Sequence, residues 1–201
     1  MSFKSYCSES ARIIEETAAR LDDERLTAAI DLVTKAIVRR SAILVCGNGG
    51  SASDAMHITG ELVGRFLKER SAFKAICLSS NSAVITAWSN DYSYDSVFAR
   101  QVEAYAETGG VLIGLSTSGN SANVVEAFAV ARKLGLNTIA LTGEGGGKLA
   151  ALSDVLLDVP SQSTPHIQQA HICIYHYLCE QVEVKCAGML GISSESPACG
   201  A

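Results

Sequence analysis

All four histidines of this 201-residue chain fall in two short segments, residues 56–61 and 164–176, which hold the residues best suited to chemistry. In the first segment, His57 and Glu61 are four residues apart, so on a helix the imidazole and the carboxylate project from one face. The second segment contributes His176 and a pair of amides. Imidazole and carboxylate groups suit proton transfer or the binding of a metal ion. The two segments therefore predict one site built from two helices that are distant in sequence.

Two turns rich in glycine and serine are candidate phosphate sites. Residues 46–51 (Cys-Gly-Asn-Gly-Gly-Ser) and 116–121 (Ser-Thr-Ser-Gly-Asn-Ser) each follow an apolar run and open a helical pattern. Hydroxyls and backbone N–H groups at the positive end of a helix suit a dianionic phosphate. The first turn also fits a relaxed dinucleotide fingerprint, but Ser-Ser-Asn at residues 79–81 replaces the acidic residue that would hold the ribose. Residues 145–148 (Gly-Gly-Gly-Lys) lack the Ser or Thr of a nucleotide P-loop, so we expect a turn there.

The elements that must position these residues follow from an alternation of short apolar runs and helical patterns. This order predicts an α/β fold, a doubly wound three-layer sandwich around a five-stranded parallel sheet. Ligands of such sheets collect at the carboxyl ends of the strands, where both turns lie. The predicted strands are residues 42–46, 74–78, 111–115, 137–141 and 155–159.

Three further helices lie outside the alternating pattern. Two of them, at about residues 6–20 and 24–40, precede the first strand, and a third, at about 165–187, closes the fold. Because their apolar faces exceed what one sheet needs, we expect them to pack against other subunits.

Composition limits the class of protein. With 48% hydrophobic residues and only three prolines, we expect one domain over residues 1–190, followed by a disordered tail at 191–201. A net charge of −5 without a cluster of basic residues disfavours direct nucleic-acid binding. We find neither a signal-peptide pattern nor an apolar run long enough for a membrane span, which predicts a cytoplasmic protein. The seven cysteines form no Cys-x-x-Cys pair and are expected to be reduced structural thiols.

Taken together, the motifs resemble the sedoheptulose 7-phosphate isomerases, also called phosphoheptose isomerases, of the sugar isomerase (SIS) domain superfamily. The resemblance rests on both turns, on the segment 54–57 (Asp-Ala-Met-His) with Glu61, on Asn-Asp at 90–91, and on Ile-Gln at 167–168 with His176. It covers the chain up to about residue 191. It implies a homotetramer with active sites built from neighbouring subunits. It also implies the first step of the ADP- or GDP-heptose pathway, which serves lipopolysaccharide, capsule or other surface glycans.

The resemblance also assigns roles to residues. An aldose–ketose isomerase needs a base and an acid to move a proton by way of an enediol, and Glu61 and His176 are the candidates. In the family a zinc ion is held by residues matching His57, Glu61, Gln168 and His176. The substrate-binding residues that we carry over are Asn48, Gly49, Gly50, Ser51, Arg65, Asn90, Asp91, Ser116, Thr117, Ser118, Ser121 and Gln168.

Several assignments keep an alternative. Gln169 lies closer than Gln168 to the helical face of His176, so helix geometry alone favours the neighbouring amide. Arg65 is either a phosphate ligand or half of a surface ion pair, and residues 90–91 either contact substrate or form a turn. His171 is expected in the core or behind the site, and residue 166 as a solvated or capping histidine.

Two rival functions remain beside the isomerase. The first is a non-catalytic SIS tetramer like the replication-initiator-associating factor DiaA, which would not need the matched pair Glu61 and His176. The second is an isomerase or sensor of another sugar phosphate, which would share every phosphate contact and differ only around the distal hydroxyls.

Overall fold

The computed structural model describes residues 2–190. Two N-terminal helices come first, α1 (Phe3–Arg20) and α2 (Asp23–Val38). Each is capped by a side chain: Ser2 accepts a hydrogen bond from the Ser5 amide, and Asp22 accepts one from the Arg25 amide. Helix α2 ends earlier than predicted because Arg40 adopts a left-handed conformation with φ of 57°.

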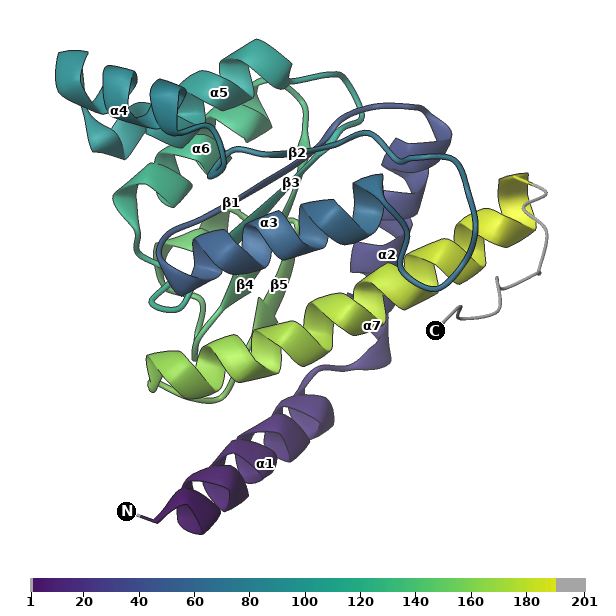
Figure 1. Cartoon of the computed structure of the whole chain (residues 1–201), viewed down its shortest axis with the longest axis vertical. Helices are drawn as coiled ribbons and strands as arrows, with labels where there is room; N and C mark the ends of the chain where they lie inside the picture. The colour runs from purple at the N-terminus through teal and green to yellow at the C-terminus, as the bar shows by residue number, and fades with distance from the viewer. Residues whose placement is uncertain (1, 191–201) are drawn as a thin grey trace, which may run out of the picture.

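Five parallel strands form one sheet in the order β2-β1-β3-β4-β5 (Figure 1). Strand β1 pairs with β2 on one side and with β3 on the other, so the chain reverses its direction of progress across the sheet between β1 and β3. This reversal creates the switch point at which open α/β sheets bind ligands. The predicted α/β fold is therefore confirmed. The strands are β1 (Ile43–Gly47), β2 (Ala75–Cys77), β3 (Val111–Ser116), β4 (Asn137–Thr142) and β5 (Val155–Asp158).

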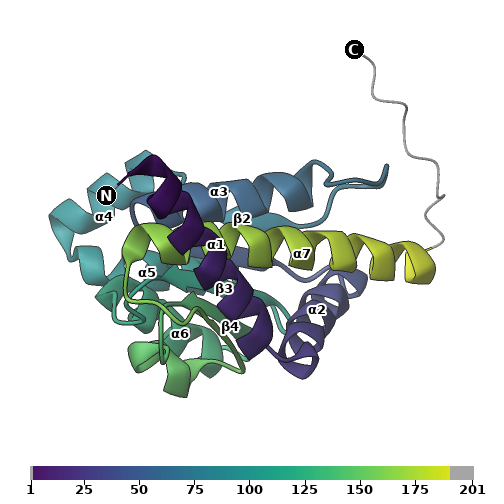
Figure 2. The ribbon, with the colours of Figure 1, turned by 90° about the horizontal axis from the view of Figure 1, so that it is seen from below.

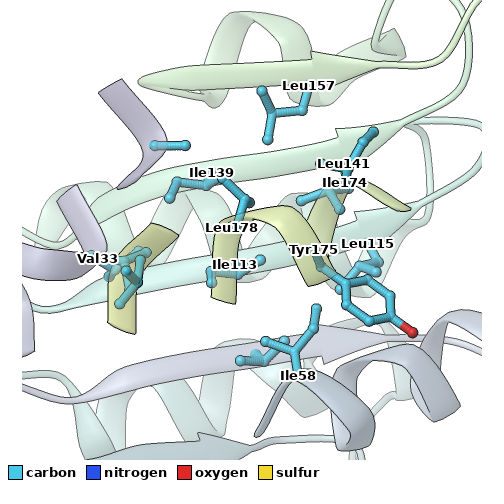
Figure 3. Close-up of a cluster of buried hydrophobic side chains, with 14 of the residues drawn as sticks. Val33, Ile58, Ile113, Leu115, Ile139, Leu141, Leu157, Ile174, Tyr175 and Leu178 are labelled. Atoms are coloured by element: carbon cyan, nitrogen blue, oxygen red, sulfur yellow. The ribbon is translucent and has the colours of Figure 1, made fainter. Parts of the chain in front are cut away.

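Alternate residues of the strands face two separate apolar cores. Val45, Ile113 and Leu141 belong to a core under α2, α3 (Gly50–Val63) and α7 (Thr164–Leu190). Leu44 and Leu112 point the other way, toward α5 (Val97–Tyr105) and α6 (Ala122–Lys133). Figure 3 shows the first core, in which α7 side chains interdigitate with those of the strands. Because both faces are covered, the strands are apolar throughout rather than alternating.

Three elements fall where the sequence pattern indicated no regular structure. Helix α4 (Ser82–Asp91) contains Asn90 and Asp91 as its last residues, so the alternative of a turn at these positions is wrong. The short 3₁₀ helix η1 (Tyr94–Ser96) directly precedes α5, and η2 (Gly147–Leu152) precedes β5. Gly146 precedes η2 in a left-handed conformation, so the turn predicted at residues 145–148 covers Gly145 and Gly146, whereas Gly147 and Lys148 begin η2.

The closing helix α7 runs along the sheet beside α3, and α1 packs across it (Figure 2). Much of its length is buried, whereas the apolar side chains of Ile172, Tyr177, Val184 and Met189 remain exposed. Packing of these exposed residues against other subunits stays a prediction. The predicted tail, residues 191–201, lies outside the described residues. None of the helices among residues 2–190 combines the length and the apolar composition that a membrane span needs.

Candidate active site

The site is built where α3 and α7 lie side by side and run in the same direction. A β carbon on Gly50 would meet the Gln168 amide, and further along the two helices His57 meets His176. His57 Nε2 lies 3.0 Å from Glu61 Oε1 and 3.4 Å from His176 Nε2. The predicted joining of two distant segments into one site is therefore what the fold produces.

The cluster of His57, Glu61 and His176 is open to solvent on one side. The His57 side chain is 45% exposed and that of Glu61 is 21% exposed. The Phe66 ring, just beyond the end of α3, lies 5.5 Å from the His176 ring, centroid to centroid. A small polar ligand can therefore reach both the carboxylate and the imidazoles.

The same three side chains fit a metal ion. One ligand atom from each of them lies within 4.8 Å of the other two. Ligands of a tetrahedral zinc ion, each about 2.0–2.2 Å from the metal, lie about 3.3–3.6 Å apart, close to the spacing seen here. Two imidazoles and one carboxylate are also the donor types that zinc prefers. The residues present therefore suit such an ion.

Asp54 and Tyr175 form a buried pair behind the cluster, which the sequence did not predict. The Tyr175 hydroxyl lies 3.0 Å from His57 Nδ1 and 3.4 Å from Asp54 Oδ1. Burial raises the pKa of the Tyr175 hydroxyl, and the nearby Asp54 raises it further, so the hydroxyl keeps its proton. Burial also raises the pKa of Asp54 above its ordinary value. The available signal was spacing, since Asp54 is one helical turn before His57 and Tyr175 adjoins His176.

The two turns meet at the switch point of the sheet. They follow β1 and β3, which are paired neighbours, so their loops lie next to each other. Asn48 in the first turn exchanges two hydrogen bonds, both 2.9 Å, with the Asn123 amide at the start of α6. The Tyr94 hydroxyl donates a third bond, of 2.7 Å, to Asn48 Oδ1. Asn123, 2% exposed, thus ties the two turns together, a role that the sequence did not suggest.

The second turn is held in shape by its own hydroxyls and by a neighbouring glycine. Ser116 Oγ lies 2.9 Å from Ser121 Oγ, and the Asn120 amide bonds to Ser118 Oγ at 3.1 Å. Gly119 has a φ of 66°, and a β carbon there would lie 2.0 Å from the Gly146 carbonyl oxygen. Only glycine fits such an approach. The turn is therefore a fixed loop leading into the amino terminus of α6, as phosphate binding requires.

The first turn places its remaining predicted residues at the start of α3. Gly49 has a φ of 57° and occupies the N-cap position without a capping side chain. Gly50 is exposed and Ser51 is 3% exposed, both in the first turn of the helix. Thr117 Oγ1 in the other turn lies 3.4 Å from Thr164 Oγ1, which brings the start of α7 to the same edge.

The structure separates the two glutamines. The Gln168 amide lies against Gly50, whereas Gln169 donates to the Tyr6 hydroxyl of α1 at 3.1 Å. Gln168 therefore faces the site side and Gln169 faces the N-terminal helix. Gly50 is seven residues, about 10 Å, before His57 on α3, so Gln168 lies nearer the first turn than the cluster of imidazoles and carboxylate.

The two remaining histidines are buried. His171 is fully buried, and its Nε2 lies 3.1 Å from the Thr142 carbonyl oxygen. Burial lowers the pKa of His171 to about 4. His166 is only 8% exposed and its ring packs 5.0 Å from the Tyr6 ring, so the expectation of a solvated histidine is wrong. Contact with α1 buries it.

Three predicted residues lie apart from the cluster. Arg65 pairs with Glu69 across 2.8 Å on the surface, the alternative considered for it. Asn90 and Asp91 are exposed and bond to each other at 2.9 Å. Their predicted contacts with substrate stay predictions.

A buried ion pair anchors the loop that follows α3 to α7. Glu183 and Arg70 have side chains only 2% and 1% exposed, with Oε1 and Nε 2.8 Å apart. Arg70 also donates to the Glu61 carbonyl oxygen at 2.7 Å, which fixes the end of the helix that carries the carboxylate. Burial by itself would raise the pKa of Glu183, but bonds from three backbone amides and the charge of Arg70 lower it overall.

Comparison with known proteins agrees with this geometry. Residues 5–143 match the SIS domain family. The chain is 48% identical over 166 residues to the phosphoheptose isomerase of Crocosphaera subtropica, covering 83% of this chain and 85% of the relative. It is 49% identical over 160 residues to that of Helicobacter pylori strain P12, covering 80% and 83%. The structure of phosphoheptose isomerase GmhA from Neisseria gonorrhoeae superposes with a TM-score of 0.85 at 40% identity, covering 90% of this chain and 96% of that one. This chain therefore belongs to the SIS domain family and, within it, to the phosphoheptose isomerases.

Proposed function

We propose that this chain is an aldose–ketose isomerase that converts sedoheptulose 7-phosphate into D-glycero-D-manno-heptose 7-phosphate. The observation that carries the proposal is the convergence of Glu61 and His176, from two different helices, on one solvent-accessible point beside His57. Family membership supports the substrate.

The reaction moves a carbonyl from C2 of the ketose to C1 of the aldose. Glu61 removes a proton from C1, which gives the enediol, and returns it to C2, while His176 moves the proton between the two oxygens. No atom is gained or lost, so a single carboxylate and a single imidazole suffice. Their proximity to each other lets Glu61 reach the two carbons while His176 reaches the oxygens bound to them.

The phosphate is proposed to bind at the paired turns. Ser116, Thr117, Ser118 and Ser121 supply hydroxyls at the amino terminus of α6, and residues 48–51 line the neighbouring turn. Helix α3 runs from this edge to His57, about 10 Å further on. Such a separation suits a substrate whose phosphate and carbonyl lie at opposite ends of a sugar chain.

A zinc ion is proposed at the same cluster. His57, Glu61 and His176 would hold it, with the Gln168 amide as the fourth ligand after a change of side-chain conformation. When bound, zinc polarises a carbonyl or fixes the acid and the base in place. The other ring nitrogen of His57, Nδ1, lies 3.0 Å from the Tyr175 hydroxyl.

The proposal also covers the location, the oligomeric state and the pathway of the enzyme. We place the enzyme in the cytoplasm as a homotetramer with active sites at subunit interfaces, and in the first step of an ADP- or GDP-heptose pathway for lipopolysaccharide or capsule. Arg65, Asn90 and Asp91 would then contact the substrate of a neighbouring subunit, which accounts for their distance from the cluster of their own chain.

The test is conversion of sedoheptulose 7-phosphate followed by NMR, before and after chelation and zinc restoration. We expect turnover that chelation abolishes and zinc restores. Glu61→Gln and His176→Gln should each abolish turnover while circular dichroism and elution volume stay unchanged, because they alter proton transfer rather than packing. Full activity in either variant would overturn the mechanism.

The same assay separates the rival functions. Turnover of another sugar phosphate but not of the heptulose would indicate a different isomerase. Absence of turnover of any sugar phosphate, with the oligomer intact, would move the weight to a binding protein of the DiaA type. Metal-independent turnover would keep the isomerase and discard the zinc.

A further inference from the structure

We propose that Asp54 and Tyr175 act as positioning residues that hold neutral His57 in one tautomer, with the proton on Nδ1 and the lone pair on Nε2. This inference rests on the proposed function, because the lone pair matters only if Nε2 is a metal ligand. Neither residue belongs to the group of three side chains whose ligand atoms converge, which is His57, Glu61 and His176.

The three side chains form a chain of contacts from the core to the site. Tyr175, 1% exposed, and Asp54, 8% exposed, lie in the interface between α3 and α7. The Tyr175 hydroxyl lies between Asp54 Oδ1, at 3.4 Å, and His57 Nδ1, at 3.0 Å. Figure 3 shows the Tyr175 ring at the rim of the apolar cluster with its hydroxyl directed out of it.

The single proton of the hydroxyl can serve only one of these neighbours. An ionised carboxylate accepts hydrogen bonds and donates none. Within residues 2–190 the Tyr175 hydroxyl is the only hydrogen-bond partner of the Asp54 carboxylate, whose Oδ2 is buried without one. The hydroxyl therefore donates to Asp54, and its oxygen accepts the proton of His57 Nδ1.

The opposite tautomer is disfavoured by burial. It would place a proton on Nε2 for Glu61, 3.0 Å away, but would turn the Tyr175 hydroxyl toward Nδ1 and leave the Asp54 carboxylate without a donor. Leaving a buried carboxylate without a hydrogen-bond donor costs more free energy than leaving a partly exposed carboxylate without one, because the exposed carboxylate can bond to water. Glu61 is the partly exposed one.

In this tautomer the His57 ring is oriented to bind a cation through Nε2. His57 Nε2 then turns a lone pair toward a carboxylate oxygen 3.0 Å away and an imidazole nitrogen 3.4 Å away. The lone pairs of His57 Nε2 and of the Glu61 carboxylate repel each other at 3.0 Å unless a positive charge lies between them. Asp54 and Tyr175 would thus raise metal affinity without contacting the metal, as partners behind a ligating histidine do.

The test reads the tautomer directly in metal-free protein. Histidine labelled with ¹⁵N is incorporated, and the two ring nitrogens are observed by NMR at about pH 8, where an ordinary imidazole is neutral. A His57→Gln sample assigns the signal. We expect the proton of His57 on Nδ1.

Asp54→Asn keeps the shape of the side chain but replaces an acceptor by a group that can donate a hydrogen bond to Tyr175. The amide donates to the Tyr175 oxygen, the hydroxyl turns to Nδ1, and the proton of His57 should move to Nε2. Tyr175→Phe is the second variant and should reduce the Nδ1-protonated fraction. Tyr177→Phe, 44% exposed on the same helix, is the matched control and should change nothing. A wild-type proton on Nε2, or a tautomer unchanged in both Asp54→Asn and Tyr175→Phe, overturns the proposal.

Zinc titration of the apoprotein by calorimetry is the second arm. Asp54→Asn and Tyr175→Phe should weaken binding by about 10- to 100-fold, whereas Tyr177→Phe should not. Unchanged affinity in the first two variants would overturn the positioning role. If the wild-type protein fails to bind zinc, the proposed metal site fails, and the NMR arm still decides the tautomer.

Discussion

Replacing Glu183 by glutamine should remove a large share of the stability of this fold. The carboxylate is 2% exposed and each of its oxygens accepts two hydrogen bonds. Oε1 accepts from the Phe66 amide and from Arg70 Nε, both at 2.8 Å, and Oε2 accepts from the Leu67 amide at 2.7 Å and the Lys68 amide at 3.0 Å. A glutamine amide has one oxygen, so in either orientation its NH₂ group faces two donors.

The loss in the free energy of unfolding can be estimated from these hydrogen bonds. Two hydrogen bonds to a charged acceptor are lost, at about 1.5–3 kcal/mol each, which gives about 3–6 kcal/mol. Breaking a buried ion pair costs a similar amount, about 3–5 kcal/mol, and this cost applies here because Arg70 is only 1% exposed and loses its counter-charge. Against a total of about 5–15 kcal/mol for a typical domain, this loss is easily measured.

The assay is urea unfolding at neutral pH with circular dichroism, for wild type, Glu183→Gln and Glu180→Gln. Glu180 lies on the same helix but is exposed, so its variant controls for loss of charge and should change stability by less than about 0.5 kcal/mol. Hydrogen exchange should also accelerate at the amides of residues 66–68. A loss below about 1 kcal/mol in Glu183→Gln, with unchanged exchange, would refute the reasoning.

Two further predictions follow from buried contacts. Burial lowers the pKa of His171 to about 4, so the folded state favours the neutral ring. The free energy of unfolding should therefore keep its full value above about pH 6.5 and fall by about 3 kcal/mol as the pH drops to 4. Urea unfolding at pH 7 and pH 4 measures it, and His171→Asn should show a smaller drop; an equal drop would contradict the assignment. Gly50→Ala would put a β carbon 2.5 Å from the Gln168 amide nitrogen, so the side chain must move and kcat/KM should fall about tenfold, the worth of one hydrogen bond. Gly60→Ala on the same helix meets nothing within 4 Å and should keep wild-type kinetics; equal kinetics in both variants would remove Gln168 from the site.

Features that depend on neighbouring residues in the chain could be predicted from the sequence. The apolar runs predicted the five strands, and the Gly/Ser turns predicted loops at their carboxyl ends, because strand burial and turn conformation are local preferences. The spacing of His57 and Glu61 placed both on one helical face for the same reason, and their side chains lie 3.0 Å apart. The helix α4, which has no buried residue, left no such periodic signal and was missed.

Contacts between residues on different helices could not be predicted from the sequence, because they depend on how the helices pack. Local geometry favoured Gln169 over Gln168, but packing turns Gln169 toward α1 and Gln168 toward Gly50. The bonds of Asn123 to the first turn and of Tyr175 to Asp54 join residues 75 and 121 positions apart. Spacing in the sequence says nothing about such pairs, because their distance is set by how the helices pack on the sheet. The strands, the turns and the reactive side chains could therefore be predicted from local sequence patterns, whereas the polar groups that orient those side chains follow from the packing of α3 against α7.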